Sequence, residues 1–296
     1  MLRPSCGWIS SAVLVAPLLT LAAAPARPQA QASVPAAGAF PGQYAMPPAD
    51  RKFPAWPKGC VRFEGEERTA CLETIASDFA GFYRYAEANA ALAARKPGEA
   101  RVVFFGDSIT DNWSKPDSGG FFPRRRYINR GIGGQTTAQM LLRFRADVVE
   151  LNALAVVILA GTNDIAGNAG VVTLDQVQDN LASMAELARS HGIRVVLASL
   201  LPVSDDKLDA NGQPITRTRQ RPTATIRELN RWLAAYAAKN GHGYLDYFKA
   251  TADGAGLLLP ALNDDGLHPN ARGYAVMAPL AEKAIAAALA ASIPMR

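Results

Sequence analysis

Four short polar stretches of the chain carry the groups that an acyl-transfer reaction needs. They read GDS at residues 106–108, RGIGGQ at 130–135, GTND at 161–164 and DGLHP at 265–269. In this order they supply a serine hydroxyl, a backbone N–H in a glycine-rich loop, an asparagine amide, and an aspartate three residues before a histidine. A nucleophile, a base beside it and donors for a developing oxyanion are the parts of an acyl-transfer site.

Taken in order, these stretches resemble the motifs of the SGNH (GDSL-type) hydrolase family. The GIGGQTT and GTND segments are most similar to the branch that holds the platelet-activating-factor acetylhydrolase catalytic subunits and their bacterial relatives. The resemblance extends over about residues 101–290, and no position of the family pattern is missing. It implies a carboxylic ester hydrolase that works through an acyl-enzyme.

The resemblance assigns a role to one residue at each position. Ser108 matches the nucleophile, which needs a base because a neutral hydroxyl attacks poorly. His268 matches that base and can return the proton to the leaving alcohol, while Asp265 matches the acid that orients the ring. The N–H groups of Ser108 and Gly134 and the amide of Asn163 match the oxyanion hole, where losing one donor typically costs about 10²–10³ in kcat.

These residues also have simpler interpretations. A serine that follows a strand can merely cap a helix, and either Asp264 or Asp265 could belong to an ordinary surface turn. The agreement of four stretches favours the catalytic interpretation of Ser108. The Asp-x-x-His spacing favours Asp265 over Asp264 as the partner of the histidine.

The remaining histidines and acids near these stretches have less specific surroundings. The chain has three histidines, of which His191 lies at a predicted helix end and His242 in a turn-like NGHG segment. Asp107 and Asp164 adjoin the proposed site residues, and we interpret them as organisers of loops and hydrogen bonds. There is no HExxH pattern, no zinc-type His/Cys cluster and no Walker or complete dinucleotide-binding pattern, so the sequence predicts no metal and no cofactor.

Two basic clusters lie close to the predicted site in the sequence. The first is RRR at 124–126 with Arg130, just before the glycine loop. The second lies in the segment 203–221, which is predicted to lie as a loop over the site, and comprises Arg217, Arg219 and Arg221. Both clusters could favour an anionic group on a substrate, and both could equally be ordinary solvated arginines. The substrate-binding residues stay unknown.

Short apolar runs alternate with amphipathic stretches from residue 101 onward. The predicted strands are 102–105, 127–129, 155–160, 195–200 and 244–247. The predicted helices are 67–95, 136–150, 173–191, 222–240 and 272–291. Apolar strands separated by helices predict an α/β fold, a flavodoxin-like three-layer α/β/α sandwich with about five parallel strands. Ligands bind beyond the carboxyl ends of such strands, where the four stretches fall.

The N-terminal part predicts export. Arg3, an apolar run over residues 9–24 and AQA at 30–32 are typical of a signal peptide, with an uncleaved anchor as the alternative. We therefore expect a signal peptide (1–32), an extended arm (33–66) and a hydrolase domain with a leading helix (67–296). Cys60 and Cys71 would then form one disulfide or remain two free thiols.

The predicted function is an exported, periplasmic or extracellular, serine esterase that cleaves small acyl groups, with O-acetyl groups on carbohydrate as the first expectation. A lipase, lysophospholipase or thioesterase for longer acyl chains is the alternative enzyme. A carbohydrate-binding protein on a hydrolase-derived fold is the non-enzymatic alternative. The formal charge of +5 is modest for 296 residues and does not call for nucleic acid. No stable membrane insertion is expected. Relatives with these motifs include dimers, and the sequence leaves the oligomeric state open.

Overall fold

The computed structural model describes residues 64–209 and 211–291. The predicted signal peptide, nearly all of the predicted arm and Cys60 lie outside these residues. The side chain of Cys71 is likewise outside the description. Cleavage, the course of the arm and the disulfide therefore stay predictions.

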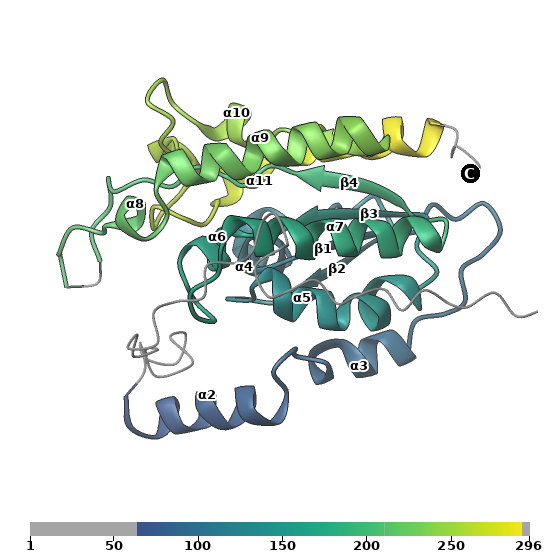
Figure 1. Cartoon of the computed structure of the whole chain (residues 1–296), viewed down its shortest axis with the longest axis horizontal. Helices are drawn as coiled ribbons and strands as arrows, with labels where there is room; N and C mark the ends of the chain where they lie inside the picture. Colours follow the sequence, from purple (N-terminus) through teal and green to yellow (C-terminus); the bar gives the residue numbers. More distant parts are fainter. Residues whose placement is uncertain (1–63, 210, 292–296) are drawn as a thin grey trace, which may run out of the picture. The chain divides into compact units, whose positions relative to one another are not determined.

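Five parallel strands form the sheet at the centre of the fold (Figure 1). They are β1 (Val102–Gly106), β2 (Tyr127–Gly131), β3 (Ala155–Leu159), β4 (Arg194–Ala198) and β5 (Gly243–Leu245). Their order across the sheet is β2-β1-β3-β4-β5, which is the flavodoxin-like order. Gly106 pairs with Gly131 on one side and with Leu159 on the other, so three neighbouring strands end at one level.

Helices cover both faces of the sheet, which confirms the predicted α/β/α sandwich. The helices are α2 (Gly65–Ser77), α3 (Tyr83–Ala90), α4 (Ser108–Asn112), α5 (Thr137–Phe144), α6 (Thr162–Ile165), α7 (Leu174–Ser190), α8 (Arg217–Gln220), α9 (Thr223–Asn240), α10 (Tyr247–Thr251) and α11 (Ala271–Ala290). A wider helical turn, Arg145–Val149, continues α5. Among the described helices, α11 is long and apolar enough to cross a membrane, and it packs against β3, β4 and β5.

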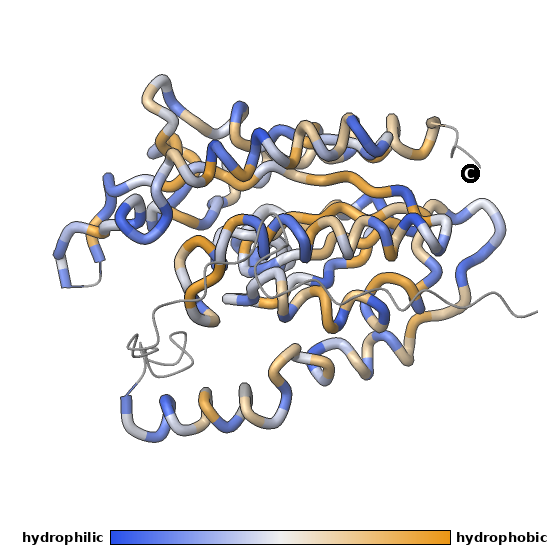
Figure 2. The backbone as a smooth tube through the Cα atoms, in the orientation of Figure 1, coloured by the Kyte–Doolittle hydropathy of each residue, from blue (hydrophilic) through white to orange (hydrophobic). Residues whose placement is uncertain are grey.

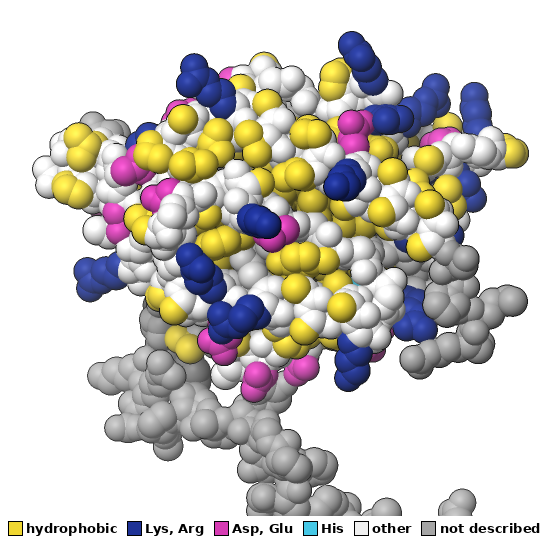
Figure 3. All heavy atoms as spheres, turned by 90° about the horizontal axis from the view of Figure 1, so that it is seen from above, with side chains coloured by type: hydrophobic (Ala, Val, Ile, Leu, Met, Phe, Trp, Pro, Cys, Tyr) yellow, Lys and Arg dark blue, Asp and Glu magenta, His cyan; other side chains and the backbone are white. Residues whose placement is uncertain are grey.

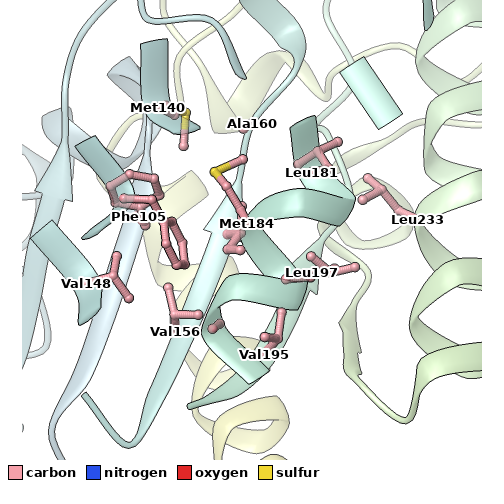
Figure 4. Close-up of a cluster of buried hydrophobic side chains, with 14 of the residues drawn as sticks. Phe105, Met140, Val148, Val156, Ala160, Leu181, Met184, Val195, Leu197 and Leu233 are labelled. Atoms are coloured by element: carbon pink, nitrogen blue, oxygen red, sulfur yellow. The ribbon is translucent and has the colours of Figure 1, made fainter. Parts of the chain in front are cut away.

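Alternating side chains of each strand supply two separate cores. Val103 and Phe105 of β1 belong to the buried cluster on the face covered by α5, α7 and α9, which also contains Met140, Met184 and Leu233. Figure 4 shows Met140 and Met184 on the side of Phe105, and Leu233 farther along the sheet. Val102 and Phe104 of β1 belong to the cluster on the other face, together with residues of α4 and α11. Figure 2 shows apolar strands at the centre and helices in which hydrophobic and hydrophilic residues alternate. On the face drawn in Figure 3, charges of both signs are interspersed with hydrophobic side chains.

The predicted helix over 67–95 is wrong in its continuity, because the chain forms two helices there. Gly81 lies at φ +71° between α2 and α3. The carboxylate of Asp78 accepts the N–H groups of Phe82 and Tyr83 at 2.8 and 2.9 Å and so provides the start of α3. Phe82 and Tyr83 are exposed, so the expected shared apolar face of this segment does not form.

A fully buried arginine, Arg143 on α5, ties the ends of the strands to the glycine loop. Its guanidinium lies over the ring of Phe105 and pairs with the buried carboxylate of Asp147 at 2.9 Å. It also donates to Gln135 Oε1 at 2.6 Å, to Arg130 O at 2.9 Å and to Gly106 O at 3.1 Å. One side chain therefore holds the carboxyl ends of β1 and β2 together with the loop that follows β2.

Replacing this arginine should strongly destabilise the protein. Arg143→Met would leave Asp147 as an unpaired buried charge, so we expect a loss of about 3–5 kcal/mol in the free energy of unfolding. Urea unfolding measures this loss. The matched control is Arg145→Met, which changes an exposed residue two positions further along the chain. Its free energy of unfolding should stay within about 0.5 kcal/mol of that of the unchanged protein. Equal stability of the two variants would contradict the role given to Arg143.

Candidate active site

Ser108, His268 and Asp265 form a continuous line of hydrogen bonds. His268 Nε2 lies 2.9 Å from Ser108 Oγ, and His268 Nδ1 lies 2.7 Å from Asp265 Oδ2. The serine and the histidine are 160 positions apart in the sequence. The structure therefore brings together the three residues that the sequence singles out for proton transfer, in the order hydroxyl, imidazole, carboxylate.

Ser108 owes its position to a tight corner at the end of β1. It is the first residue of α4, and the carboxylate of Asp107 caps this helix by accepting the N–H of Ile109 at 2.9 Å. A side chain at Gly106 would meet the hydroxyl of Thr110 and the carbonyl of Leu159 at 2.1 and 2.9 Å. Glycine at 106 is thus a requirement of the corner that presents the serine hydroxyl.

The loop that carries the acid and the histidine is equally constrained. Gly266 lies at φ +76°, and a Cβ there would stand 2.4 Å from the carbonyl of Ser204. The Gly266 N–H donates to Asn263 Oδ1 at 2.7 Å, while the Ser204 N–H donates to the Gly266 carbonyl at 2.9 Å. Only glycine fits between Asp265 and the following residues, so the Asp-x-x-His spacing comes with a defined backbone.

Both carboxylate oxygens of Asp265 are engaged. Besides the ring of His268, this carboxylate accepts the N–H groups of Leu267 at 3.0 Å and of His268 at 2.7 Å. Burial acts to raise the pKa of Asp265, but the hydrogen bonds and the charge of His268, with the backbone donors, outweigh it and lower the pKa. Asp265 is therefore ionised at neutral pH. Asp264 instead accepts a hydrogen bond from Asn270 Nδ2 at 3.0 Å.

The glycine loop after β2 holds one N–H in use and one free. The Gly133 N–H donates to the carboxylate of Asp111 at 3.2 Å. Gly134 has φ +80°, and in the described part of the chain its N–H meets no hydrogen-bond acceptor. An oxyanion needs donors whose protons are not already taken, so Gly134 rather than Gly133 is the available backbone donor.

Asn163 is buried at the start of α6, with its carboxamide orientation determined by its partners. Its Oδ1 accepts from Asn168 Nδ2 at 2.9 Å and from Arg221 Nη2 at 3.3 Å. Because a guanidinium only donates, the atom that faces Arg221 is the oxygen. The Nδ2 group therefore faces the glycine loop, where it donates to the carbonyl of Gln135 at 3.0 Å.

Two members of the second arginine cluster are not solvated side chains, and both bond to residues of the site. Arg221 is buried and donates to Thr162 Oγ1 at 3.1 Å as well as to Asn163. Arg217 donates through Nε to the carbonyl of Asp265 at 3.1 Å, and its Nη2 lies 3.6 Å from the Asp265 carboxylate. Only Arg219 is an exposed side chain of the kind expected. The hydrophobic periodicity of the sequence could not reveal these contacts, because an arginine in a predicted loop is normally expected to be exposed to solvent.

The first cluster divides in the same way. Arg124, Arg125 and Arg126 are exposed, whereas Arg130 is buried beside the ring of Tyr85 and donates to Asn89 Oδ1 at 2.8 Å. Arg130 therefore joins the leading helix α3 to the end of β2.

The leading segment also holds the glycine loop directly, a role that the sequence did not suggest. Gln135 Nε2 donates to the carbonyl of Ala80 at 2.7 Å, and Gln139 Nε2 donates to the carbonyl of Phe79 at 2.9 Å. The hydroxyl of Tyr85 donates to the carbonyl of Gly131. These bonds attach the residues before and within α3 to both ends of the loop that contains Gly134.

The two acids that adjoin the site are organisers, as predicted. Asp164 accepts both the backbone N–H and the hydroxyl of Thr137, at 3.0 and 2.6 Å, and so joins α6 to the start of α5. Burial raises the pKa of Asp164, although the Thr137 donors oppose this shift. Among the described residues no group of three or more His, Cys, Asp or Glu side chains is arranged to hold a metal ion.

Comparison with known proteins gives one family and several relatives. The sequence profile of the GDSL-like Lipase/Acylhydrolase family matches residues 104–276, a range that includes all four polar stretches. A GDSL-like lipase from Bacteroides thetaiotaomicron is 41% identical, with a TM-score of 0.64 over 71% of this chain and 99% of that one. Its likeness agrees with the five-stranded parallel sheet and the helices on both sides.

Two curated relatives are similar over part of their length. Esterase TesA from Pseudomonas aeruginosa is 32% identical over 144 residues, which is 49% of this chain and 61% of that protein. The uncharacterized lipoprotein YqeF from Bacillus subtilis is 32% identical over 136 residues, which is 39% of this chain and 53% of that protein. The chain thus spans between half and two thirds of the curated relatives that it matches.

The buried acid beside the serine should make stability depend on pH. Burial raises the pKa of Asp107 to about 6, against the donor Ile109 N–H and the positive charges of His268 and Arg221. The pKa of an aspartate in the unfolded chain is about 3.9. Between that pH and about 6 the folded protein binds more protons than the unfolded chain. The free energy of unfolding therefore falls as the pH rises over this range, by on the order of 3 kcal/mol. Asp107→Asn keeps an oxygen for Ile109 but cannot ionise, and should lack this loss.

Urea unfolding of both proteins from pH 4 to pH 8 tests the expectation. As the pH rises toward about 6, Asp107→Asn should become progressively more stable relative to the unchanged protein. Above that pH the difference between their free energies of unfolding should stay constant. All other titrating groups are common to the two proteins and cancel. Parallel stability curves over this range would show that Asp107 does not titrate with a raised pKa.

Proposed function

The chain belongs to the GDSL-like lipase/acylhydrolase family, and we propose that it is a carboxylic ester hydrolase that acts through an acyl-enzyme formed on Ser108. The observation that carries this proposal is the 2.9 Å contact between Ser108 Oγ and His268 Nε2, backed by the 2.7 Å contact between His268 Nδ1 and Asp265. A hydroxyl becomes a useful nucleophile when an oriented base stands at this distance.

The reaction runs in two balanced halves. In the first, His268 takes the proton of Ser108 while Oγ bonds to the carbonyl carbon of the ester, and the tetrahedral intermediate then expels the alcohol, which receives that proton. In the second, His268 takes a proton from water, the resulting hydroxide bonds to the acyl carbon, and the carbon–Oγ bond breaks. The proton returns to Ser108 and the carboxylic acid leaves.

Asp265 supports both halves without exchanging a proton. Its lowered pKa keeps it ionised, so it accepts a hydrogen bond from the Nδ1–H group of His268 and leaves Nε2 as the site that receives the serine proton. When the ring becomes positively charged, the carboxylate at 2.7 Å stabilises that charge.

The negative oxygen of each tetrahedral intermediate is assigned to three donors. They are the N–H groups of Ser108 and Gly134 and the Nδ2 group of Asn163. The free N–H of Gly134 and the orientation of the Asn163 amide toward the glycine loop support this assignment. Donors that are already in place need no reorganisation as charge develops, which makes them effective in catalysis.

For the substrate we propose a small acyl group, in the first place O-acetyl, on a larger alcohol such as a saccharide. Ser108 and His268 are partly exposed. A partly open serine suits a short acyl group and leaves room for a bulky alcohol, whereas a long acyl chain needs an apolar channel.

We also propose export to the periplasm or the exterior, after cleavage of a signal peptide at about residue 32. The signal-like composition of the first 32 residues supports this, together with the similarity to a protein described as a lipoprotein. The binding partner that we propose for the site is an ester substrate, carried by a small molecule or a saccharide.

Hydrolysis of p-nitrophenyl acetate, butyrate and octanoate tests the proposal. We expect the acetate to have the highest kcat/KM, because the site offers room for a small acyl group. Ser108→Ala should lower kcat by about 10⁴-fold or more, since the nucleophile is lost while the fold remains. The matched control is Ser183→Ala, which removes an exposed hydroxyl on α7 and should leave kcat unchanged.

Other outcomes lead to different conclusions. A preference for octanoate would keep the mechanism and replace the small acyl group by a longer one. An active Ser108→Ala protein would show that Ser108 is not the nucleophile. Saccharide binding without turnover of any of the three esters would contradict the acyl-enzyme and favour a carbohydrate-binding protein.

A further inference from the structure

We propose that Arg221 and Asn168 are positioning residues that hold the Asn163 carboxamide in the one orientation that presents its N–H to the oxyanion. The inference rests on the proposed function, because it takes Asn163 as an oxyanion donor. Neither residue belongs to the four polar stretches, and both are joined to Asn163 through its oxygen rather than its nitrogen.

An isolated carboxamide can place either its oxygen or its nitrogen toward a substrate. The two orientations have opposite effects, since an oxygen would repel the developing negative charge. Here Asn163 Oδ1 receives Asn168 Nδ2 at 2.9 Å and Arg221 Nη2 at 3.3 Å. A rotated amide would place its own donors against two donors inside a buried pocket, which is costly. The two neighbours therefore exclude the unproductive orientation.

Arg221 itself is fixed by contacts from two elements. Its Nε donates to Thr162 Oγ1 at 3.1 Å, and its Nη1 donates to Gln220 Oε1 at 3.2 Å. Only 4% of Arg221 is exposed, and within the described part of the chain it forms no ion pair. Its hydrogen bonds go to neutral acceptors, while the nearby carboxylates of Asp107 and Asp265 oppose the effect of burial on its pKa. Burial of a cation without a directly bonded carboxylate costs stability, which is consistent with a role at the site.

This role follows from the direction of the bonds. A guanidinium that donates to the carboxamide oxygen draws electron density from the amide and makes its N–H a stronger donor. The same charge adds positive potential behind the site where the oxyanion forms. Burial lowers the pKa of Arg221 to about 10, so the side chain is still charged at neutral pH.

Asn168 connects the two proposed donors to each other. Its Nδ2 donates to Asn163 Oδ1 at 2.9 Å and to the carbonyl of Gly134 at 3.3 Å, while its backbone N–H donates to the carbonyl of Asn163 at 3.0 Å. One side chain thus sets the spacing between the loop after β2 and the loop after β3. A change in Asn168 should therefore disturb both donors at once.

A double-mutant cycle with p-nitrophenyl acetate tests the inference on the full chain. The proteins are Arg221→Met, Asn163→Ala, the double variant and the unchanged protein, with kcat and KM measured for each. We expect Arg221→Met to lower kcat by about 10- to 100-fold and to leave KM within about threefold. The reason is that an Asn163 amide without fixed orientation should stabilise the oxyanion less well, while its deletion should remove that stabilisation altogether. In the Asn163→Ala background the same change should alter kcat by less than about threefold.

The matched control is Arg219→Met, which removes an exposed arginine of the short helix α8, two residues before Arg221. It should leave kcat unchanged. Should Arg221→Met fail to fold, as judged by circular dichroism and thermal unfolding, Asn168→Ala replaces it in the same cycle. It should lower kcat at least as much as Arg221→Met in the unchanged protein. In the Asn163→Ala background it should keep only the smaller loss that acts through Gly134.

The outcomes separate this inference from the proposed function. The positioning role would be overturned if the fold-losses in kcat of Arg221→Met and Asn163→Ala multiplied in the double variant. It would also be overturned if Arg221→Met kept the kcat of the unchanged protein. The proposed mechanism would remain in both cases. Wild-type kcat in Asn163→Ala would remove Asn163 from the oxyanion hole, and the positioning role with it. Loss of kcat in Arg221→Met together with the absence of further loss in the double variant is the result expected here.

Discussion

The common level at which three neighbouring parallel strands end is the constraint on which the site depends. Gly106, Gly131 and Leu159 stand side by side in the register of β2, β1 and β3. The serine corner, the glycine loop and the asparagine turn therefore begin at the same height and converge beyond it. A shift of one strand by a single residue would move its loop by about 3.3 Å, more than a hydrogen bond can follow.

Buried polar side chains, rather than apolar packing, maintain this alignment. Arg143 bonds the last carbonyls of β1 and β2, and Asp164 joins the asparagine turn to the start of α5. Arg221 and Asn168 do the same for the carboxamide of Asn163. Apolar contacts are non-directional, whereas hydrogen bonds require a narrow range of distance and angle, and those to charged groups are the stronger ones. The protein thus combines two apolar cores with a polar layer at the edge where chemistry takes place.

Much of this could be read from the sequence, and the part that could not has a physical explanation. The runs around Val103, Val157 and Val196 are apolar on both faces, which identifies them as central parallel strands, and the strand ends then locate the polar stretches. Ser108, His268 and Asp265 could be proposed from the sequence because each lies in a short, recognisable motif. The sequence did not indicate the interruption between α2 and α3 at Asp78. A single capping carboxylate does not disturb the helical spacing of the apolar residues on either side of it. Arg143 and Arg221 were missed because burial of a cation depends on partners from distant segments.

The central claim is that Ser108 alone becomes covalently acylated, and active-site labelling measures this directly. The purified chain is incubated with a fluorophosphonate ester, which bonds to activated serines, and the modified residue is identified by peptide mass spectrometry. The account predicts one adduct, on Ser108, which is lost when His268 is replaced by glutamine. An adduct on a different residue, or no adduct in a preparation that hydrolyses p-nitrophenyl acetate, would contradict it.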